Sequence, residues 1–158
     1  MDDANLQAQV AQHGPQLIHW VASVPDVAAA CTALSALDMD RGAVITASRP
    51  TPHGLLQWQI TVRDDGLRLM DGCLPTLIQW GAVHPCDSLP ASGVQLEQLA
   101  LQHPQAATLQ AACNAVGVAA SVHVTPYAAP RLSAQLSTPR GPVTVSYTHL
   151  TLPTILLV

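Results

Sequence analysis

The most constraining feature of the sequence is an internal repeat. The runs LIHWVASVPD (17–26) and LEQLALQHPQ (96–105) align without a gap, with Pro25 and Pro104 in equivalent places. An Ala-rich helical stretch follows each run, and three more strand-like runs follow the helix. A repeat of this length constrains the architecture more firmly than local propensities do. It predicts an α+β fold of two βαβββ modules packed side by side, forming a cupped, mixed or antiparallel sheet whose concave face would carry the function.

Breaks in this pattern set the expected boundaries. We expect a lead-in helix at 1–16, a first module at 17–82 and a second module at 94–144. The segment between the modules, 83–93, is rich in Pro, Gly and Ser and has no periodicity, which is typical of a linker. The final segment, 145–158, includes VSYTHLTLPT, which resembles a sequencing adapter translated in frame. We therefore expect a non-native tail there; the alternative is a native last strand with an apolar end.

Hydrophobic periodicity places elements in the first module. Val27, Cys31 and Leu34 recur at helical spacing, and Pro25 suits the first turn of that helix. The run LLQWQITV (55–62) is the clearest strand. Its alternation puts Leu56, Trp58, Ile60 and Val62 on one face and Gln57 and Gln59 on the other.

The second module shows the same signals with one irregularity. The alternation slips between Leu96 and Leu99, which indicates a β-bulge. Gly117 would cap the end of the following helix. The apolar stripe of that helix is Ala106, Leu109, Cys113 and Val116.

Composition excludes several classes of function. The chain has six arginines, no lysine and a net charge of −4, so there is no basic surface for nucleic acid. The arginine and alanine bias is typical of a GC-rich bacterial coding sequence. No apolar run is long enough to span a membrane, and the polar N-terminus is not a signal peptide. The four cysteines lack CxxC spacing, and Cys31 and Cys113 are expected as small core residues. We expect a cytoplasmic protein.

Several segments together carry a family resemblance. The sequence is similar to the glyoxalase-like domain proteins of the vicinal oxygen chelate superfamily, which includes glyoxalase I, extradiol dioxygenases and bleomycin-resistance proteins. The resemblance runs from about residue 5 to residue 144. Similar proteins open with an upstream Leu-Asp-His strand that has no counterpart here, which implies a truncated N-terminus. The matching segments are LIHWVASVPD (17–26), LLQWQITVRDDG (55–66), LPTLIQWG (74–81), HPCDSLPASGV (84–94) and TPRGPV (138–143).

The resemblance implies a divalent metal in the concave sheet, held by His and Glu ligands from the first and last strands of each module. Carried over residue by residue, these positions are His19, Gln79 and Gln98, and the last falls near 143–145, where no ligand occurs. Neutral amides are weak ligands for zinc, nickel or iron. His19 is therefore the one candidate metal ligand, and the ligand set looks incomplete.

The candidate ligand pocket comprises His19, Gln57, Gln59, Gln79 and Gln98. Each has a structural alternative. A strand histidine is often a hydrogen-bonded core residue, and the glutamines fit a solvated sheet face as well as a pocket wall.

Three functions remain open. The first is binding of a small oxygenated organic molecule in the concave sheet, with metal-assisted lyase, isomerase or dioxygenase chemistry. The second is metal-free binding of a small molecule, as in resistance proteins, and the third is an inactive fragment. No catalytic residue is predicted, because nucleophile, phosphate-loop and HExxH motifs are absent from the sequence. Similar proteins often pair modules between chains, so the resemblance also implies a homodimer.

Overall fold

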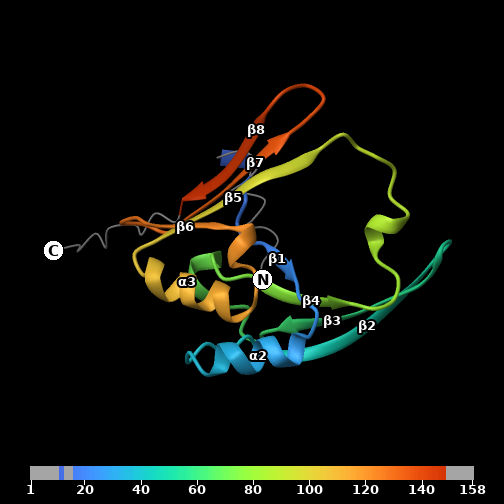
Figure 1. Cartoon of the computed structure of the whole chain (residues 1–158), viewed down its shortest axis with the longest axis horizontal. Coiled ribbons are helices and arrows are strands. Elements are labelled where there is room, and N and C mark those ends of the chain that lie inside the picture. Colours follow the sequence, from blue (N-terminus) through green and yellow to red (C-terminus); the bar gives the residue numbers. More distant parts are fainter. Residues whose placement is uncertain (1–10, 13–15, 149–158) are drawn as a thin grey trace.

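The structure is a computed structural model that describes residues 11–12 and 16–148. In this part of the chain, the strands form two four-stranded sheets (Figure 1). Sheet A contains β1 (Val21–Ser23), β2 (Ala43–Thr51), β3 (Gly54–Val62) and β4 (Thr76–Trp80). Sheet B contains β5 (Gln95–His103), β6 (His123–Pro126), β7 (Arg131–Ser137) and β8 (Val143–Thr148).

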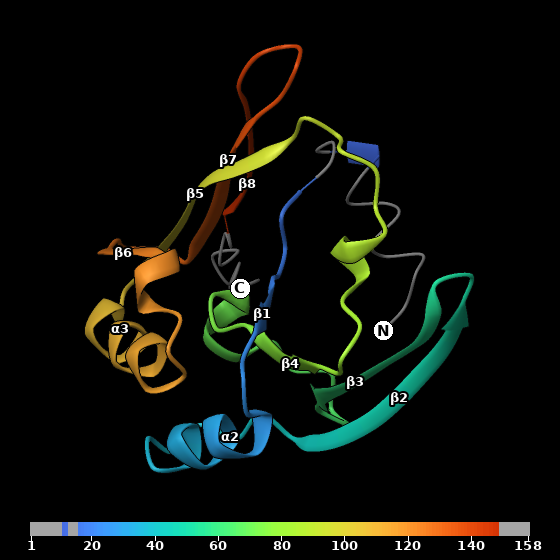
Figure 2. The same ribbon diagram turned by 45° about the vertical axis from the view of Figure 1, so that its right-hand side comes forward.

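One α-helix belongs to each module: α2 (Val27–Ser35) follows β1, and α3 (Ala106–Ala115) follows β5. Short 3₁₀ turns occupy Leu69–Gly72 (η1), Pro85–Asp87 (η2) and Ala119–Ser121 (η3). The order of elements is therefore βαβββ in both modules, which confirms the predicted α+β class and the paired modules. Figure 2 shows α2 below sheet A and the segment joining the modules above it.

The two modules nevertheless pair their strands differently. Sheet A has the order β1-β4-β3-β2, with β1 at an edge and parallel to β4. Sheet B has the order β6-β5-β7-β8, so its first strand is central, parallel to β6 and antiparallel to β7. Each sheet is thus mixed, but the repeat in sequence does not produce one repeated strand order.

The helix α2 begins at Val27, two residues after Pro25, so the prediction that Pro25 lies in its first turn is wrong. Asp26 is the N-cap, and its side chain accepts a hydrogen bond from the backbone N–H of Ala29 at 2.9 Å. Pro25 therefore lies before the cap and not in the first turn, because a carboxylate satisfies a helix N-terminus directly. The predicted apolar stripe is confirmed at Val27 and Leu34, which are buried, while Cys31 is only half-buried.

Sheet B shows the predicted irregularity. The register of β5 against β7 shifts between Leu96 and Gln98, so the predicted β-bulge is confirmed. The helix α3 buries Leu109 and Cys113, as the apolar spacing predicts. Gly117 follows this helix with a φ of 77°, a conformation that a glycine adopts without strain, which agrees with its predicted role at the helix end.

A single hydrophobic core joins the two modules. Helices α2 and α3 contact each other, and the buried cluster includes Leu34 and Leu77 from the first module with Leu101, Leu109 and Leu132 from the second. Burial of large aliphatic side chains is the main stabilising contribution in such a core. The modules therefore share the core that stabilises both.

The ends of the chain are described only in part. The predicted lead-in helix lies almost wholly outside the described residues, as do residues 149–158 of the predicted tail. The strand β8 pairs Val143–Thr148 with β7, so residues 145–148 of that tail continue a strand. Within the described part, no helix is both long and apolar enough to cross a membrane.

Candidate functional site

A small cavity lies where β3 ends and β4 begins, with a few polar side chains in a largely apolar wall. Its volume is about 270 Å³. The cavity is lined by the buried Arg41 and Thr61 and by the half-buried His19 and Thr76. The described residues contain three buried polar side chains, and Arg41 and Thr61 are two of them. The remaining lining residues are Ile18, Val62, Arg63, Gly66, Leu67 and Arg68. Among the described residues, no carboxylate belongs to this lining.

Two glycines allow the backbone to close around the cavity. A Cβ on Gly42 would lie 2.1 Å from the carbonyl oxygen of Val62, and a Cβ on Gly72 would lie 2.5 Å from that of Ile18. Both have positive φ angles, 81° and 92°, which glycine tolerates best. These close approaches hold the loop carrying Arg41 against the end of β3, and η1 against the residues before β1.

His19 lies two residues before β1 and connects η1 to β4. Its Nδ1 is 3.2 Å from the carbonyl oxygen of Gly72, and its Nε2 is 2.9 Å from Oγ1 of Thr76. A carbonyl only accepts, so Nδ1 carries the proton and Nε2 is the acceptor. The backbone N–H of Thr76 also donates to Nε2, at 3.2 Å.

A chain of hydrogen bonds continues from His19 to Arg41. Nη2 of Arg41 donates to Oγ1 of Thr76 at 2.9 Å, so the hydroxyl hydrogen of Thr76 is free to be donated to Nε2 of His19. Burial lowers the pKa of His19 below its ordinary value; its bond to Gly72 opposes this shift, and the charges of Arg41 and Arg68 add to it. The imidazole is therefore neutral at pH 7, consistent with Nε2 acting as an acceptor.

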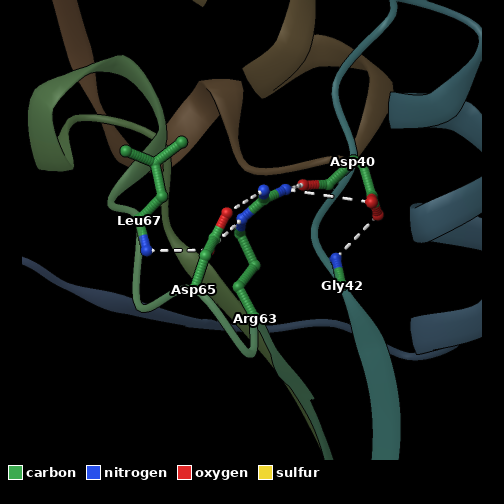
Figure 3. A network of polar contacts seen from close by, with 5 residues as sticks. All are labelled: Asp40, Gly42, Arg63, Asp65 and Leu67. Carbon is green, nitrogen blue, oxygen red and sulfur yellow. Dashed lines mark hydrogen bonds and ion pairs between the residues drawn. The ribbon is translucent and has the colours of Figure 1, made fainter.

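Arg63 forms a separate ionic network at the rim of the cavity (Figure 3). Its Nε and Nη2 donate to the carboxylate of Asp65 at 2.9 and 2.6 Å, and its Nη1 donates to the backbone carbonyl of Asp40. The carboxylate of Asp40 is 3.8 Å from the same Nη1. Hydrogen bonds from Arg63 and Leu67 lower the pKa of Asp65 to about 2, so this pair is ionised at neutral pH.

The predicted pocket residues do not all meet at one place. His19 lines the cavity described above. Gln57, Gln59 and Gln79 line a different hollow of about 290 Å³ with Trp58 and Trp80, toward the other end of β3 and β4. Gln98 is exposed on β5 and lines neither hollow.

Gln79 has a structural role in this arrangement. Its Oε1 accepts a hydrogen bond of 2.9 Å from the backbone N–H of Val27, at the start of α2. The first N–H groups of a helix lack partners within the helix, and this bond satisfies one of them. Gln59 lies opposite Gln79 in the pairing of β3 with β4, and both Gln57 and Gln59 are exposed.

Sequence reasoning missed Arg41, Thr61, Arg68 and Thr76. A single arginine between a helix and a strand usually lies at the surface, and no periodicity marks it as buried. The one usable signal was Gly42, because a glycine directly before a strand indicates a positive φ angle or a close backbone approach.

The described residues around His19 do not fit the divalent metal that the superfamily implies. Both ring nitrogens of His19 are hydrogen-bonded, and the guanidinium groups of Arg41 and Arg68 line the same cavity and would repel a cation. No group of three His, Cys, Asp or Glu side chains suited to a metal occurs within 11–12 and 16–148.

The fold is an α+β arrangement of two βαβββ modules with a small cavity in the first of them. A family model described as Glyoxalase-like domain matches residues 2–117, so the chain belongs to the glyoxalase-like domain family. The match includes every residue that lines the cavity and ends just after α3. No curated protein and no solved structure gave a significant match.

Proposed function

We propose that this protein binds a small oxygenated organic molecule without a metal, in the cavity beside His19. The carrying observation is the chain of hydrogen bonds from Arg41 through Thr76 to His19, which lines a hollow of about 270 Å³. This volume is slightly below the usual range for drug-sized ligands, so the ligand is small.

The donors and acceptors around the cavity suit oxygen-rich ligands. Arg41 and Arg68 supply N–H donors, and the Thr76 hydroxyl both donates and accepts. The apolar side chains of Ile18, Val62 and Leu67 provide contact surface beside these polar groups. A few oriented polar groups within an apolar wall are the usual composition of a small-molecule site.

The absence of suitable metal donors around His19 favours binding over metal-assisted catalysis. In the superfamily's metal-dependent chemistry, the metal acts as a Lewis acid on substrate oxygens. Here, Nε2 of His19 could ligate a metal only by giving up its hydrogen bonds from Thr76. The glutamines in the hollow at the other end of β3 and β4 add only neutral amides.

A ligand screen with and without chelator tests this proposal. Small hydroxy, keto and carboxy compounds are screened by thermal shift on the purified protein, before and after EDTA treatment, with metal content measured in parallel. We expect at least one compound to raise Tm equally in both samples. Thr76→Val should weaken its binding, while Thr46→Val, an exposed threonine on β2, should not. A stoichiometric divalent metal that is lost in His19→Ala together with ligand binding would refute metal-free binding.

A further inference from the structure

Arg41 is a buried cation that forms no ion pair within the part of the chain that the structure describes. It is 5% exposed, and its Nη2 donates to Thr76. Its Nε and Nη1 are shielded from solvent and have no hydrogen-bond acceptor among the described residues. Buried polar groups are nearly always hydrogen-bonded, and an unpaired buried charge is strongly unfavourable. Such a group in a cavity wall indicates a missing partner.

The neighbouring acids do not supply that partner. Asp65 is bound to Arg63 through both carboxylate oxygens. Asp40 accepts from the backbone N–H of Gly42 and lies close to Arg63. Within the described part of the chain, no carboxylate lies within ion-pair distance of Arg41. The two arginines therefore differ: Arg63 is paired with carboxylates of the described residues, and Arg41 is paired with none of them.

We propose that the ligand of this cavity carries an oxyanion, a carboxylate or a phosphate group, which binds to Arg41. This inference rests on the proposed function and adds the chemical class of the ligand. The planar guanidinium donates two parallel hydrogen bonds to a carboxylate or phosphate, and it prefers these groups to neutral acceptors. Arg68 lines the same cavity and adds a second positive charge.

The local geometry permits this contact. Arg41 lines the cavity and its Nη2 contacts a hydroxyl of the cavity wall. Because Nε and Nη1 are shielded in this arrangement, the guanidinium turns toward the cavity when it binds a ligand oxygen. Each N–H that gains a charged acceptor forms a charge-assisted hydrogen bond, which is stronger than a bond between neutral groups. The Thr76 hydroxyl, which accepts from Arg41 and donates to His19, holds these two side chains in place at the cavity wall.

The test compares ions with matched uncharged molecules in wild type and two arginine variants. The carboxylate arm uses glycolate, lactate and pyruvate, and the phosphate arm uses inorganic phosphate and glycerol phosphate. Lactamide is the uncharged counterpart of lactate. Binding is measured by calorimetry and thermal shift. Arg41→Met removes the buried cation, and Arg49→Met removes an exposed cation on β2 as the matched control.

We expect one arm to bind wild type saturably and lactamide to bind at least about tenfold more weakly, the difference expected for a charge-assisted hydrogen bond. Arg41→Met should lose about tenfold to a hundredfold in affinity, and Arg49→Met should lose none. Arg41→Met should fold at least as stably as wild type, because replacing an unpaired buried charge by an apolar side chain removes a desolvation cost. A variant that keeps its fold and loses binding separates a ligand contact from a structural role.

Several outcomes overturn the inference. Equal binding of lactate and lactamide, or equal losses in the two arginine variants, would show that Arg41 does not receive an anion. If only uncharged compounds bind, the proposed function stands and the anion assignment fails. If neither ions nor uncharged compounds bind, both proposals fail. Which arm binds identifies the oxyanion as carboxylate or phosphate.

Discussion

The contact between Gln79 and the start of α2 leads to a sharp prediction. Gln79→Met keeps the length of the side chain and removes the oxygen that accepts from the backbone N–H of Val27 at 2.9 Å. Val27 is 0% exposed, so water does not reach the N–H to replace this bond. A buried donor left without an acceptor costs about 1–3 kcal/mol. For a chain of this size, that corresponds to a fall in Tm of roughly 2–12 °C.

Gln79→Glu is the matched variant. It keeps an oxygen acceptor and places negative charge at a helix N-terminus, where it is favourable by about 0.3–1 kcal/mol. We expect it to remain within about 1 kcal/mol of wild type. Urea unfolding followed by far-UV circular dichroism measures both variants. Equal losses in Met and Glu variants, or no loss in Gln79→Met, would refute the capping role. A ligand of the His19 cavity should bind Gln79→Met as tightly as wild type, because Gln79 lies outside that cavity.

Three further predictions concern the core, pH and thiols. Leu101→Ala, at a site that is 0% exposed, should lower the free energy of unfolding by about 2–5 kcal/mol, in one cooperative urea transition. Leu96→Ala, at a site that is 58% exposed, is the control and should lower it by at most about 0.5 kcal/mol. Two separate unfolding transitions would contradict a core shared by the two modules. Burial lowers the pKa of His19, so the unfolded chain binds more protons than the folded chain does. The contribution of the neutral His19 to the free energy of unfolding should therefore be fully present above pH 6.5 and be lost as the pH falls through the lowered pKa. His19→Gln should flatten a profile of Tm measured from about pH 5 to 8. The exposed Cys86 should react with a thiol reagent in the native protein, whereas Cys113, whose pKa burial raises to about 11, should react only after unfolding. Peptide mass mapping of the labelled protein measures both reactions. Labelling of Cys113 in the native protein would contradict its burial.

Local patterns in the sequence predicted local structure well. The spacing of Leu109 and Cys113 gave the buried face of α3, and the slip in alternation gave the bulge of β5 between Leu96 and Gln98. Both depend on residues close together in the chain, where one period or one break in it determines which side chains face inward. The wrong prediction for Pro25 was equally local. Proline and aspartate both favour the start of a helix, and here Asp26 is the N-cap, so Pro25 lies before the helix.

Long-range pairing was beyond such patterns. Alternation along β3 and β4 is consistent with Gln59 facing Gln79, but it could not show that the N-terminus of α2 lies beside Gln79 and uses its oxygen. Arg41 was missed for a related reason. Its burial depends on Gly42 approaching Val62, two segments that are twenty residues apart in sequence and are joined only by the folded sheet. A site built from contacts between distant segments is not marked by hydrophobic periodicity in the sequence.

The asymmetry between the modules explains why the cavity belongs to the first of them. His19 precedes a three-residue strand at the sheet edge, so its ring is free to bond to Gly72 and Thr76. The repeat makes Gln98 its counterpart, but Gln98 lies inside a nine-residue central strand and is paired with Gln135. Neighbouring strands and backbone hydrogen bonds occupy both flanks of that strand. The cavity beside His19 therefore forms where the first strand of the repeat is short and at an edge, and it has no counterpart where that strand is long and central.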